Sequence, residues 1–313
     1  MTDQVANAVI VRDLTRCFGE LTAVDGLSFE VRHGELFGLV GPDGAGKTTT
    51  LRMLAGVLRP TSGDATLNGI SVSSDPEGVK HGLAYMSQRF GLYSDLTVLE
   101  NLHFYADLYQ VPKSERDSRL ERLYQFSNLG AFSDRLAGKL SGGMKQKLGL
   151  SCALIHQPEI LLLDEPTFGV DPVSRRDLWV IVHEMVAQGV TVIVSTAYMD
   201  EAERFDRVLL LDHGRAVALD TPDALQQSIQ GDMVSVIVDR PGDASETART
   251  SPAVRRATVF GDRLHLTVRN AASDLPDVVA LLEREGYRVG TVEQIEPSME
   301  DVFVDRLARG DRK

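Results

Sequence analysis

The chain has 313 residues, of which 43% are hydrophobic and 25% are charged, and its formal net charge is −12. This composition is typical of a folded protein with one large domain and a smaller one. The negative charge argues against general binding to nucleic acid or to anionic lipid. Cys17 and Cys152 lie far apart in the sequence, outside any zinc-ligand spacing, so neither a disulfide framework nor a zinc site is expected.

The sequence shows no targeting segment and no membrane span. Residues 1–7 lack a basic region followed by an apolar stretch, so we expect no signal peptide. The longest apolar runs are far shorter than the roughly 18–20 residues that a spanning helix needs. A cytosolic protein is therefore expected, and any role at a membrane would depend on a partner.

Short apolar runs alternate with helical patterns along most of the chain. Residues 8–33 and 64–72 are expected to form strands of an antiparallel layer, and residues from about 92 to 155 a mainly helical lobe. Buried strands are expected at 36–40, 160–163, 190–194 and 208–211. The alternation predicts an α/β fold with a mostly parallel sheet covered by helices.

A glycine-rich motif follows the first buried strand. The sequence Gly41-Pro42-Asp43-Gly44-Ala45-Gly46-Lys47-Thr48 matches G-x-x-x-x-G-K-[ST] at every fixed position. In this motif backbone N–H groups surround a phosphate, Lys47 would bridge the β- and γ-phosphates, and the Thr48 hydroxyl would bind Mg²⁺. The alternative, a glycine-rich turn formed by chance, is disfavoured by the strand before it and the helix expected after it.

Two carboxylates end the strand expected at 160–163. Asp164 is expected to reach Mg²⁺ beside the phosphate loop, partly through water. Glu165 is then placed to polarise an attacking water as general base. A solvated acidic turn is the alternative for the pair taken alone. Together with the phosphate loop, the pair predicts a P-loop ATPase.

The rest of the chain is marked by clear start and stop signals. Asp171-Pro172 predicts the cap and first turn of a helix that ends at Gly189. After about residue 225 the pattern changes, with a capping box at Ser298-Met299-Glu300-Asp301 before a last helix. Strands expected at 233–238 and 264–268, with a helix at 277–284, predict a small α+β domain over residues 226–313, after a first domain over 1–225.

A further motif, Leu140-Ser141-Gly142-Gly143-Met144-Lys145-Gln146, precedes the acidic strand, and a helix is expected from Met144 to Ile155. It resembles the signature loop of the nucleotide-binding ATPases of ABC transporters, although Ser-Gly-Gly alone could also be a helix cap without a ligand. In that family Ser141, Gly142 and Gly143 would contact the γ-phosphate held by the Lys47 loop of the other subunit. The resemblance therefore implies a dimer, either of two identical chains or with a second ATP-binding cassette.

The resemblance covers about residues 6–225 and assigns ATP and Mg²⁺ as cofactors. It implies that Gly41 to Thr49 hold the nucleotide, with Thr49 following Thr48 in this role. Phe18 matches the aromatic residue that stacks on adenine, and Gln88 the glutamine that senses Mg²⁺ and the attacking water. Asp171 matches the loop that touches the opposite active site. The structural alternatives are a core aromatic for Phe18, a surface glutamine for Gln88 and a helix cap for Asp171, which is compatible with the family role.

The end of the chain, from Glu296 to Phe303, looks like the end of ATPases from ABC-2 type exporters of drugs and polysaccharides. The resemblance implies an ATPase subunit at the inner face of the plasma membrane, without a nucleic-acid partner. It would drive export by separate integral membrane permease subunits, which would dock near Arg89–Leu96. The C-terminal domain would strengthen the dimer, regulate it or serve only as a packing appendage. The alternatives are a non-transport ABC ATPase with a regulatory role and a degenerate cassette that binds ATP but hydrolyses it poorly.

One position departs from the family pattern in a way that bears on hydrolysis. Ala197, in Ser195-Thr196-Ala197-Tyr198, stands where the family has its switch histidine. Loss of one transition-state donor commonly costs about 10²–10³ in rate. Three interpretations follow: slow hydrolysis by a homodimer, pairing with a cassette that carries a histidine, or closure driven by binding and reset by hydrolysis. Asp43, where many relatives have asparagine, is a lesser departure.

Overall fold

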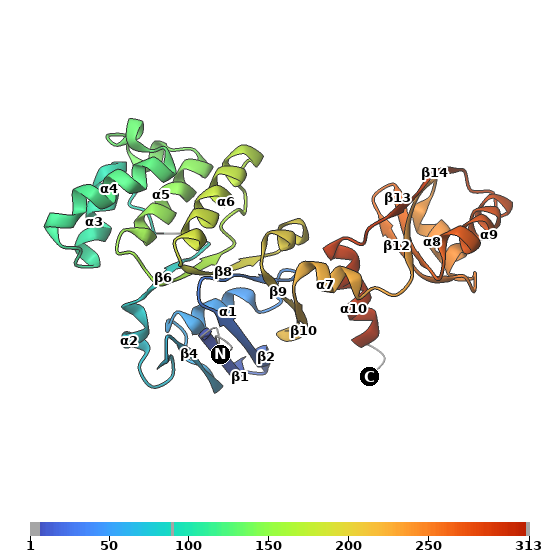
Figure 1. Cartoon of the computed structure of the whole chain (residues 1–313), viewed down its shortest axis with the longest axis horizontal. Coiled ribbons are helices and arrows are strands. Elements are labelled where there is room, and N and C mark those ends of the chain that lie inside the picture. Colours follow the sequence, from blue (N-terminus) through green and yellow to red (C-terminus); the bar gives the residue numbers. More distant parts are fainter. Residues whose placement is uncertain (1–6, 89–90, 311–313) are drawn as a thin grey trace, which may run out of the picture. The chain divides into compact units, whose positions relative to one another are not determined.

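The structure is a computed structural model that describes residues 7–88 and 91–310. The chain divides into two compact units, residues 1–219 and 220–313 (Figure 1). The boundary expected at 225 falls inside helix α7 (Pro222–Gln227). Thr221 caps this helix by accepting a hydrogen bond from the Ala224 N–H, and Pro222 begins it, so the second unit starts with a complete helix.

The first unit begins with the antiparallel sheet that the sequence predicts. Its strand order is β2-β1-β4-β5. Its strands are β1 (Asn7–Phe18), β2 (Leu21–Arg32), β4 (Ser62–Leu67) and β5 (Ile70–Ser71). Buried and exposed residues alternate along β2, as they do in a sheet with one face on the core.

A six-stranded sheet forms the centre of the first unit, with the order β10-β9-β3-β8-β7-β6. Its strands are β3 (Leu36–Val40), β6 (Leu83–Met86), β7 (Ile160–Asp164), β8 (Thr191–Thr196), β9 (Arg207–Asp212) and β10 (Arg215–Asp220). The pairs β9–β3, β3–β8, β8–β7 and β7–β6 are parallel. Every residue of β3, β7 and β8 is buried, which explains their continuous apolar sequences and confirms the predicted parallel core.

Helices pack against the inner strands of this central sheet. Helix α1 (Lys47–Leu54) contacts β7 and β8 of the parallel sheet and also β2 and β4 of the antiparallel one, so one apolar core joins both sheets. Helix α6 (Pro172–Ala187) contacts β8 and buries Leu178, Ile181, Val182 and Met185, as the helical spacing predicts. The loop before α1 is thereby fixed between two sheets.

A mainly helical lobe occupies the chain between β6 and β7. Figure 1 shows α3, α4 and α5 grouped together beside α6. The lobe contains α3 (Val98–Leu108), α4 (Lys113–Ser127), α5 (Gly142–Leu154) and two 3₁₀ turns, η1 (Gly130–Phe132) and η2 (Ala137–Lys139). The first unit also has α2 (Pro76–Lys80) and η3 (Met199–Arg204). Helix α5 contacts α3, α4, α6 and β6, and so links the lobe to the sheet.

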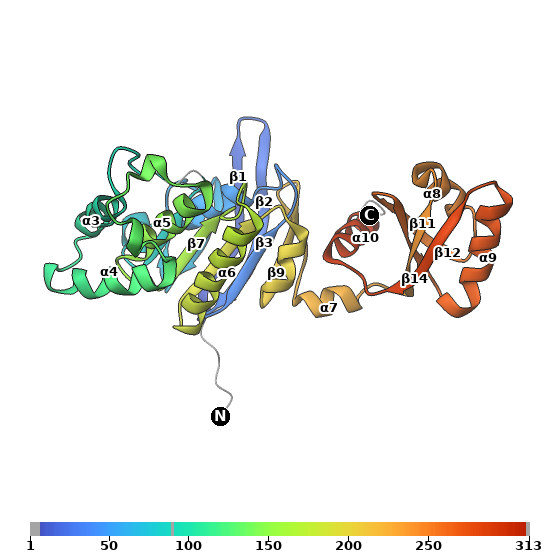
Figure 2. The ribbon, with the colours of Figure 1, turned by 90° about the horizontal axis from the view of Figure 1, so that it is seen from above.

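The second unit is the predicted α+β domain. Its elements are β11 (Asp232–Val238), α8 (Pro241–Arg249), β12 (Val254–Phe260), β13 (Arg263–Val268), α9 (Ala271–Arg284), β14 (Val289–Ile295) and α10 (Met299–Gly310), after α7. The strand order β12-β13-β11-β14 and the order β-α-β-β-α-β along the chain define a ferredoxin-like arrangement. Figure 2 shows α9 and α10 on opposite sides of this sheet.

Within the part of the chain that the structure describes, no helix combines the length and the apolar character needed to cross a membrane.

Candidate nucleotide-binding site

The loop between β3 and α1 depends on its glycines. Gly44 and Gly46 have φ values of 80° and 98°, a region that strongly favours glycine. Gly41 is required for a different reason, because a Cβ atom there would lie 2.2 Å from the Leu211 carbonyl oxygen. The loop is also fixed by a hydrogen bond from the Gly41 N–H to the Thr196 carbonyl (3.3 Å). The motif residues therefore form a rigid turn at the carboxyl ends of β3, β8 and β9.

Lys47 lies inside this loop with its ammonium group almost fully buried. Its Nζ atom donates hydrogen bonds to the carbonyl oxygens of Gly41 (2.8 Å) and Pro42 (3.0 Å). It also forms an ion pair with Oε1 of Glu165 at 3.3 Å. An ammonium group has three donors, and here all three have partners, as a buried charge requires.

The carboxylate of Asp164, at the end of β7, is surrounded by hydroxyl groups. Its Oδ1 atom accepts hydrogen bonds from Thr48 Oγ1 (2.9 Å) and Ser195 Oγ (2.7 Å), and its Oδ2 atom accepts one from the Tyr85 hydroxyl (3.2 Å). Burial and then the neighbouring Asp164 charge raise the pKa of Tyr85 to about 12, so this hydroxyl remains protonated and donates. The carboxylate is 1% exposed and held on both oxygens.

Glu165 follows Asp164 with a left-handed backbone, at φ 49°. Its Oε2 atom accepts a hydrogen bond from Gln88 Nε2 (3.1 Å), while Oε1 faces Lys47. Gln88 comes two residues after β6, so the strand order β8-β7-β6 brings it beside the end of β7. The structure therefore places Glu165 in direct contact with both Lys47 and Gln88.

A cavity of about 380 Å³ unites most of the predicted nucleotide-site residues. Phe18 lines one part of it, with 46% of its surface exposed, and Arg16 lies over its ring at 4.5 Å from the centroid. The volume is in the usual range for small-molecule sites. The lining residues are Phe18, Leu21, Ala23, Asp43, Gly44, Ala45, Gly46, Lys47, Thr48, Thr49, Gln88 and Glu165.

The residues of the signature motif and Asp171 do not line this cavity. Ser141 caps α5 by accepting a hydrogen bond from the Met144 N–H (3.3 Å), and Gly142 beside it is exposed. Asp171 caps α6, and hydrogen bonds from the Ser174 N–H and then the Val173 N–H lower the pKa of its carboxyl. The two loops are adjacent, and both present polar groups to solvent.

The signature helix starts earlier than the sequence predicts. A start at Met144 was expected, but α5 begins at Gly142, directly after the Ser141 cap. Gly143 is buried in the first turn, where a Cβ atom would lie 2.1 Å from Ser174 Oγ of α6. Close packing of α5 on α6 therefore requires glycine at this position.

The segment that carries Ala197, after β8, is held in place by contacts with helix α6. Thr196 donates a hydrogen bond to Glu201 Oε2 (2.6 Å), and Glu201, which is 1% exposed, also accepts one from Trp179 Nε1 (3.3 Å). Arg175 lies over the Tyr198 ring at 4.3 Å. This segment is thus held to α6, and no histidine is found among the described residues that line the cavity.

The oxygen ligands at Thr48 and Asp164 fit Mg²⁺. Nowhere in residues 7–88 and 91–310 do three or more His, Cys, Asp or Glu side chains form a group that could hold a metal alone. Mg²⁺ is commonly bound by one or two protein oxygens, with water and substrate phosphates as the other ligands. Because the Thr48 hydroxyl gives its hydrogen to Asp164, its oxygen lone pairs remain available for a cation.

Two residues around Asp164 were not predicted as site residues. Ser195 pairs with Asp164 in the parallel register of β8 and β7, and Tyr85 lies on the next strand, β6. The sequence does contain a signal for Ser195. It is a hydroxyl residue near the end of a buried apolar strand, where a polar side chain needs a partner. Tyr85 has no comparable signal.

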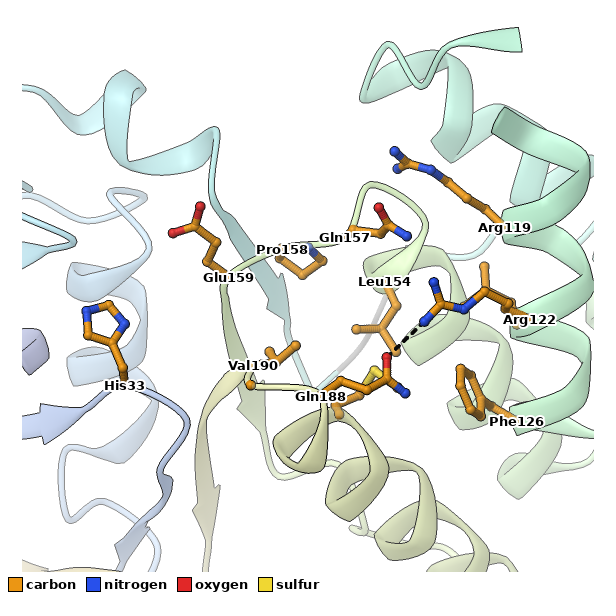
Figure 3. Close-up of a pocket in the computed structure, with 13 residues that line it drawn as sticks. His33, Arg119, Arg122, Phe126, Leu154, Gln157, Pro158, Glu159, Gln188 and Val190 are labelled. Atoms are coloured by element: carbon orange, nitrogen blue, oxygen red, sulfur yellow. Dashed lines mark hydrogen bonds between the residues drawn. The ribbon is translucent and has the colours of Figure 1, made fainter. Parts of the chain in front are cut away.

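A second cavity, of about 440 Å³, lies near the amino ends of β7 and β8, away from the phosphate loop (Figure 3). Three charged side chains that line it already have hydrogen-bond partners. Arg122 reaches from α4 to Gln188 Oε1 (3.0 Å), and Arg119 donates to the Ile155 carbonyl (2.9 Å). Glu159 accepts a hydrogen bond from the Asn68 side chain. The other polar residues labelled in Figure 3 include His33 and Gln157, which are exposed to solvent, so no buried polar group that would point to a ligand is seen among these residues.

Comparisons with known proteins identify a family for each part of the chain. The family model described as ABC transporter matches residues 24–168, and the one described as ATP-binding protein DrrA1-3-like, C-terminal domain, matches residues 221–307. The chain is 44% identical over 287 residues to the probable multidrug ABC transporter ATP-binding protein YbhF of Escherichia coli, covering 91% of this chain. It spans only 49% of YbhF, about half the length of that relative.

Two further similarities cover most of both proteins. The daunorubicin resistance ATP-binding protein DrrA2 of Streptomyces coeruleorubidus is 35% identical over 302 residues, which are 95% of this chain and 94% of that protein. A solved structure described as the ATP binding subunit of an ABC transporter is 31% identical, with a TM-score of 0.64 over 70% of this chain and 92% of that one. The chain therefore belongs to the ATP-binding protein family of ABC transporters.

Proposed function

We propose that this chain binds Mg·ATP in the cavity beside the phosphate loop and hydrolyses it, with Glu165 as the general base. The observation that carries the proposal is the position of the Glu165 carboxylate, 3.3 Å from Lys47 Nζ and 3.1 Å from Gln88 Nε2. A base held between a cation and an amide donor at a phosphate-binding loop suits the activation of water for attack on phosphorus.

The roles of the other residues follow from their places in the cavity. The loop from Gly41 to Thr49 would hold the nucleotide, with the backbone N–H groups from Asp43 to Thr49 around the β-phosphate, and Lys47 would leave its loop carbonyls to bind the β- and γ-phosphates. The exposed face of Phe18 would stack on adenine. Thr48, Asp164 and Gln88 would hold Mg²⁺, partly through water, and the cation would neutralise charge on the phosphates.

Hydrolysis then needs one proton transfer and one displacement. Glu165 accepts a proton from the water that Gln88 helps to orient, and the water oxygen bonds to the γ-phosphorus. The bond from the γ-phosphorus to the β–γ bridging oxygen breaks, and ADP and phosphate leave. Lys47 stabilises the negative charge that develops on the bridging and γ-phosphate oxygens.

Two copies of the chain would form two complete sites. Ser141, Gly142, Gly143 and Asp171 lie outside the cavity of their own chain, although they belong to the predicted site. A two-fold pair brings the Ser141 loop of one copy against the Lys47 loop of the other, and each chain carries both halves. The helix start at Ser141 would then add N–H donors for the γ-phosphate.

We further propose that this pair drives export through separate membrane subunits at the inner face of the plasma membrane. A groove of about 260 Å³ lies between Gln88 and residues of the helical lobe. Its lining residues are Gln88, Leu92, Ser94, Ala137, Gly138, Lys145 and Gln146. The docking segment expected at Arg89–Leu96 overlaps this groove, but Arg89 lies outside the described residues. The names of YbhF and DrrA2, a multidrug transporter protein and a drug-resistance protein, support export.

Ala197 favours one second candidate: a cassette that binds ATP tightly but hydrolyses it slowly. Alanine supplies no donor to the γ-phosphate or to the attacking water, so the rate depends on Glu165 and Gln88 without that contribution. The two candidates differ in turnover and agree on the site.

The test is Mg²⁺-dependent ATP hydrolysis by the purified chain over a series of protein concentrations, with Glu165→Gln as the blank. We expect turnover above the blank that rises faster than linearly with protein concentration, as formation of active pairs requires. Lys47→Ala should lose ATP binding, whereas Glu165→Gln should keep it. Binding without turnover above the blank would favour the second candidate, and absence of ATP binding would refute both.

A further inference from the structure

We propose that Ser195 is a positioning residue for ATP hydrolysis, because its hydroxyl joins the Asp164 carboxylate to the backbone of Glu165. The proposal rests on the function proposed above and adds a residue of strand β8 to it.

Ser195 makes two hydrogen bonds that one hydroxyl group can satisfy together. Its Oγ atom donates to Asp164 Oδ1 at 2.7 Å and accepts from the Glu165 N–H at 3.0 Å. A hydroxyl has one hydrogen and two lone pairs, so both bonds can form at once. Ser195 is 0% exposed, and water has no ready access to replace either bond.

The bond to the Glu165 N–H acts at an unusual backbone position. Glu165 has a φ of 49°, a conformation that non-glycine residues adopt only where the surroundings hold it. Its N–H is shared between the Ser195 carbonyl (3.1 Å) and the Ser195 hydroxyl (3.0 Å). Since φ sets the direction in which the side chain leaves the backbone, these bonds help to direct the Glu165 carboxylate toward Lys47 and Gln88.

The bond to Asp164 fixes the carboxylate proposed to serve Mg²⁺. Without the Ser195 hydroxyl, Oδ1 would retain only the Thr48 hydroxyl, and Oδ2 the longer bond from Tyr85. Groups that orient a metal-binding carboxylate commonly contribute about 10–100-fold to metal affinity or activity. One hydroxyl therefore acts on both carboxylates that hydrolysis needs.

Strand β8 is also the strand that ends without a histidine. Ala197 gives the site no polar side chain, whereas Ser195, two residues earlier, remains bound to both Asp164 and Glu165. Among the side chains of this strand, Ser195 is thus the one that contacts Asp164 and Glu165.

The test compares three variants of the full chain. Ser195→Ala removes the hydroxyl, and Ser195→Thr retains one. Thr191→Ala is the matched control, because Thr191 is a buried residue of the same strand whose hydroxyl accepts a hydrogen bond from the Gly34 N–H (3.0 Å) at the other end of β8. Binding of a fluorescent ATP analogue is measured as a function of Mg²⁺ concentration, together with kcat and KM.

For Ser195→Ala we expect the Mg²⁺ concentration at half-saturation to rise about tenfold or more and kcat to fall by a similar factor. KM for ATP and binding of the analogue without Mg²⁺ should stay close to the wild-type values. Thr191→Ala and Ser195→Thr should retain the wild-type Mg²⁺ dependence. A merely structural role of Ser195 would instead lower the melting temperature and leave the Mg²⁺ dependence unchanged.

A second measurement needs neither nucleotide nor metal. Hydrogen exchange of the Glu165 amide should become faster in Ser195→Ala than in Thr191→Ala, because only the former removes an acceptor of that N–H. The proposal is overturned if Ser195→Ala equals Thr191→Ala in Mg²⁺ dependence, in kcat and in this exchange rate. If the wild-type chain itself binds no Mg·ATP, the proposed function fails as well. If the wild type binds and hydrolyses ATP as expected, only the role of Ser195 is refuted.

Discussion

At the scale of single residues, the site consists of buried charges whose partners are all provided by the fold. Lys47 is bonded to two loop carbonyls and to Glu165, and Asp164 to three hydroxyl groups. Such groups are held in position before any ligand arrives, because an unpaired buried charge is strongly destabilising. Ala197, by contrast, provides no polar side chain to the site.

We predict that Ala197→His accelerates hydrolysis. Residue 197 directly follows β8, whose Thr196 carbonyl is hydrogen-bonded to the phosphate loop. An imidazole there adds a donor for the γ-phosphate, so kcat should rise about tenfold or more with little change in ATP affinity. The measurement is steady-state ATPase activity with Ala197→Leu as the control, since leucine adds bulk without a donor. Equal rates for wild type and Ala197→His would show that this position does not reach the reacting phosphate.

The motif residues of the cavity could be predicted from sequence, because phosphate binding requires glycines, a lysine and a hydroxyl at fixed spacing. Ser195 could not be assigned in the same way. Its role depends on the register that sets it beside Asp164 on a neighbouring strand, and a sequence pattern does not encode that register. Tyr85 could not be assigned either, because it lies on a third strand, β6, whose register is likewise not encoded in the sequence pattern.

At the scale of secondary-structure elements, the contact between α5 and α6 controls the signature loop. Gly143 in the first turn of α5 is packed against Ser174 in the first turn of α6. The caps of both helices, Ser141 and Asp171, therefore keep a fixed separation. Any side chain at position 143 must push the two helix starts apart.

We predict that Gly143→Ala lowers ATPase activity at least tenfold while ATP binding to the Lys47 loop stays unchanged. The Cβ atom would lie 2.1 Å from Ser174 Oγ and 2.2 Å from Ser174 Cβ, so the Ser141 loop must shift. Shifts of this size at a reacting phosphate commonly cost about 10²-fold. Ser174→Gly removes the clashing atoms, and the double variant should recover activity. If the double variant is as inactive as Gly143→Ala, the loss does not arise from this contact.

In the second unit, α10 is joined to the sheet by a buried pair. His265 Nδ1 lies 2.9 Å from Asp301 Oδ1, and Ser298 and Asp301 form the predicted capping box. Burial alone would raise the pKa of Asp301, but hydrogen bonds from His265 and Ser298 outweigh it and lower this pKa below its ordinary value of 3.8. A lowered folded-state pKa contributes stability above the unfolded pKa, and this stability is lost as the pH falls through the folded pKa.

We therefore predict that Asp301→Asn lowers the melting temperature of the second unit by roughly 5 °C at pH 7, the effect of about 1 kcal/mol in a domain of this size. The difference from wild type should begin to shrink as the pH falls below 3.8, where the carboxyl of the unfolded chain becomes protonated, and should shrink further until the pH is below the lowered pKa of the folded state. Calorimetry of the full chain measures this, and the relevant transition is the one that ATP does not shift. An equal difference at both pH values would show that the charge of Asp301 does not contribute.

In the first unit, β3, β7, β8 and β9 were predictable because their apolar runs are buried. In the second unit, α8, β12 and β14 were not expected. Helix α8 buries only alanine and serine, and β14 is an edge strand with mostly exposed side chains, so neither shows strong periodicity. Helix α9 was expected from residue 277 but starts at Ala271, where Asn270 caps it, and it includes Pro276.

At the scale of the whole molecule, one chain carries both halves of the proposed site on separate surfaces. The phosphate loop, Glu165 and Gln88 share one cavity, and Ser141 and Asp171 lie outside it. This separation is the reason to propose a pair of chains in which each site is composite. If each site is composite, two inactive variants can complement each other in a mixed pair, which a site built within one chain does not allow.

The most direct test mixes two inactive variants. Lys47→Ala removes the phosphate lysine, and Ser141→Arg blocks the signature loop, so each pure variant should be inactive. In an equal mixture half of the pairs contain both variants, and each mixed pair has one intact site of two. Activity should therefore recover to about a quarter of the wild-type value in a two-fold pair. A mixture as inactive as its components, under conditions in which the wild type hydrolyses ATP, would contradict the account.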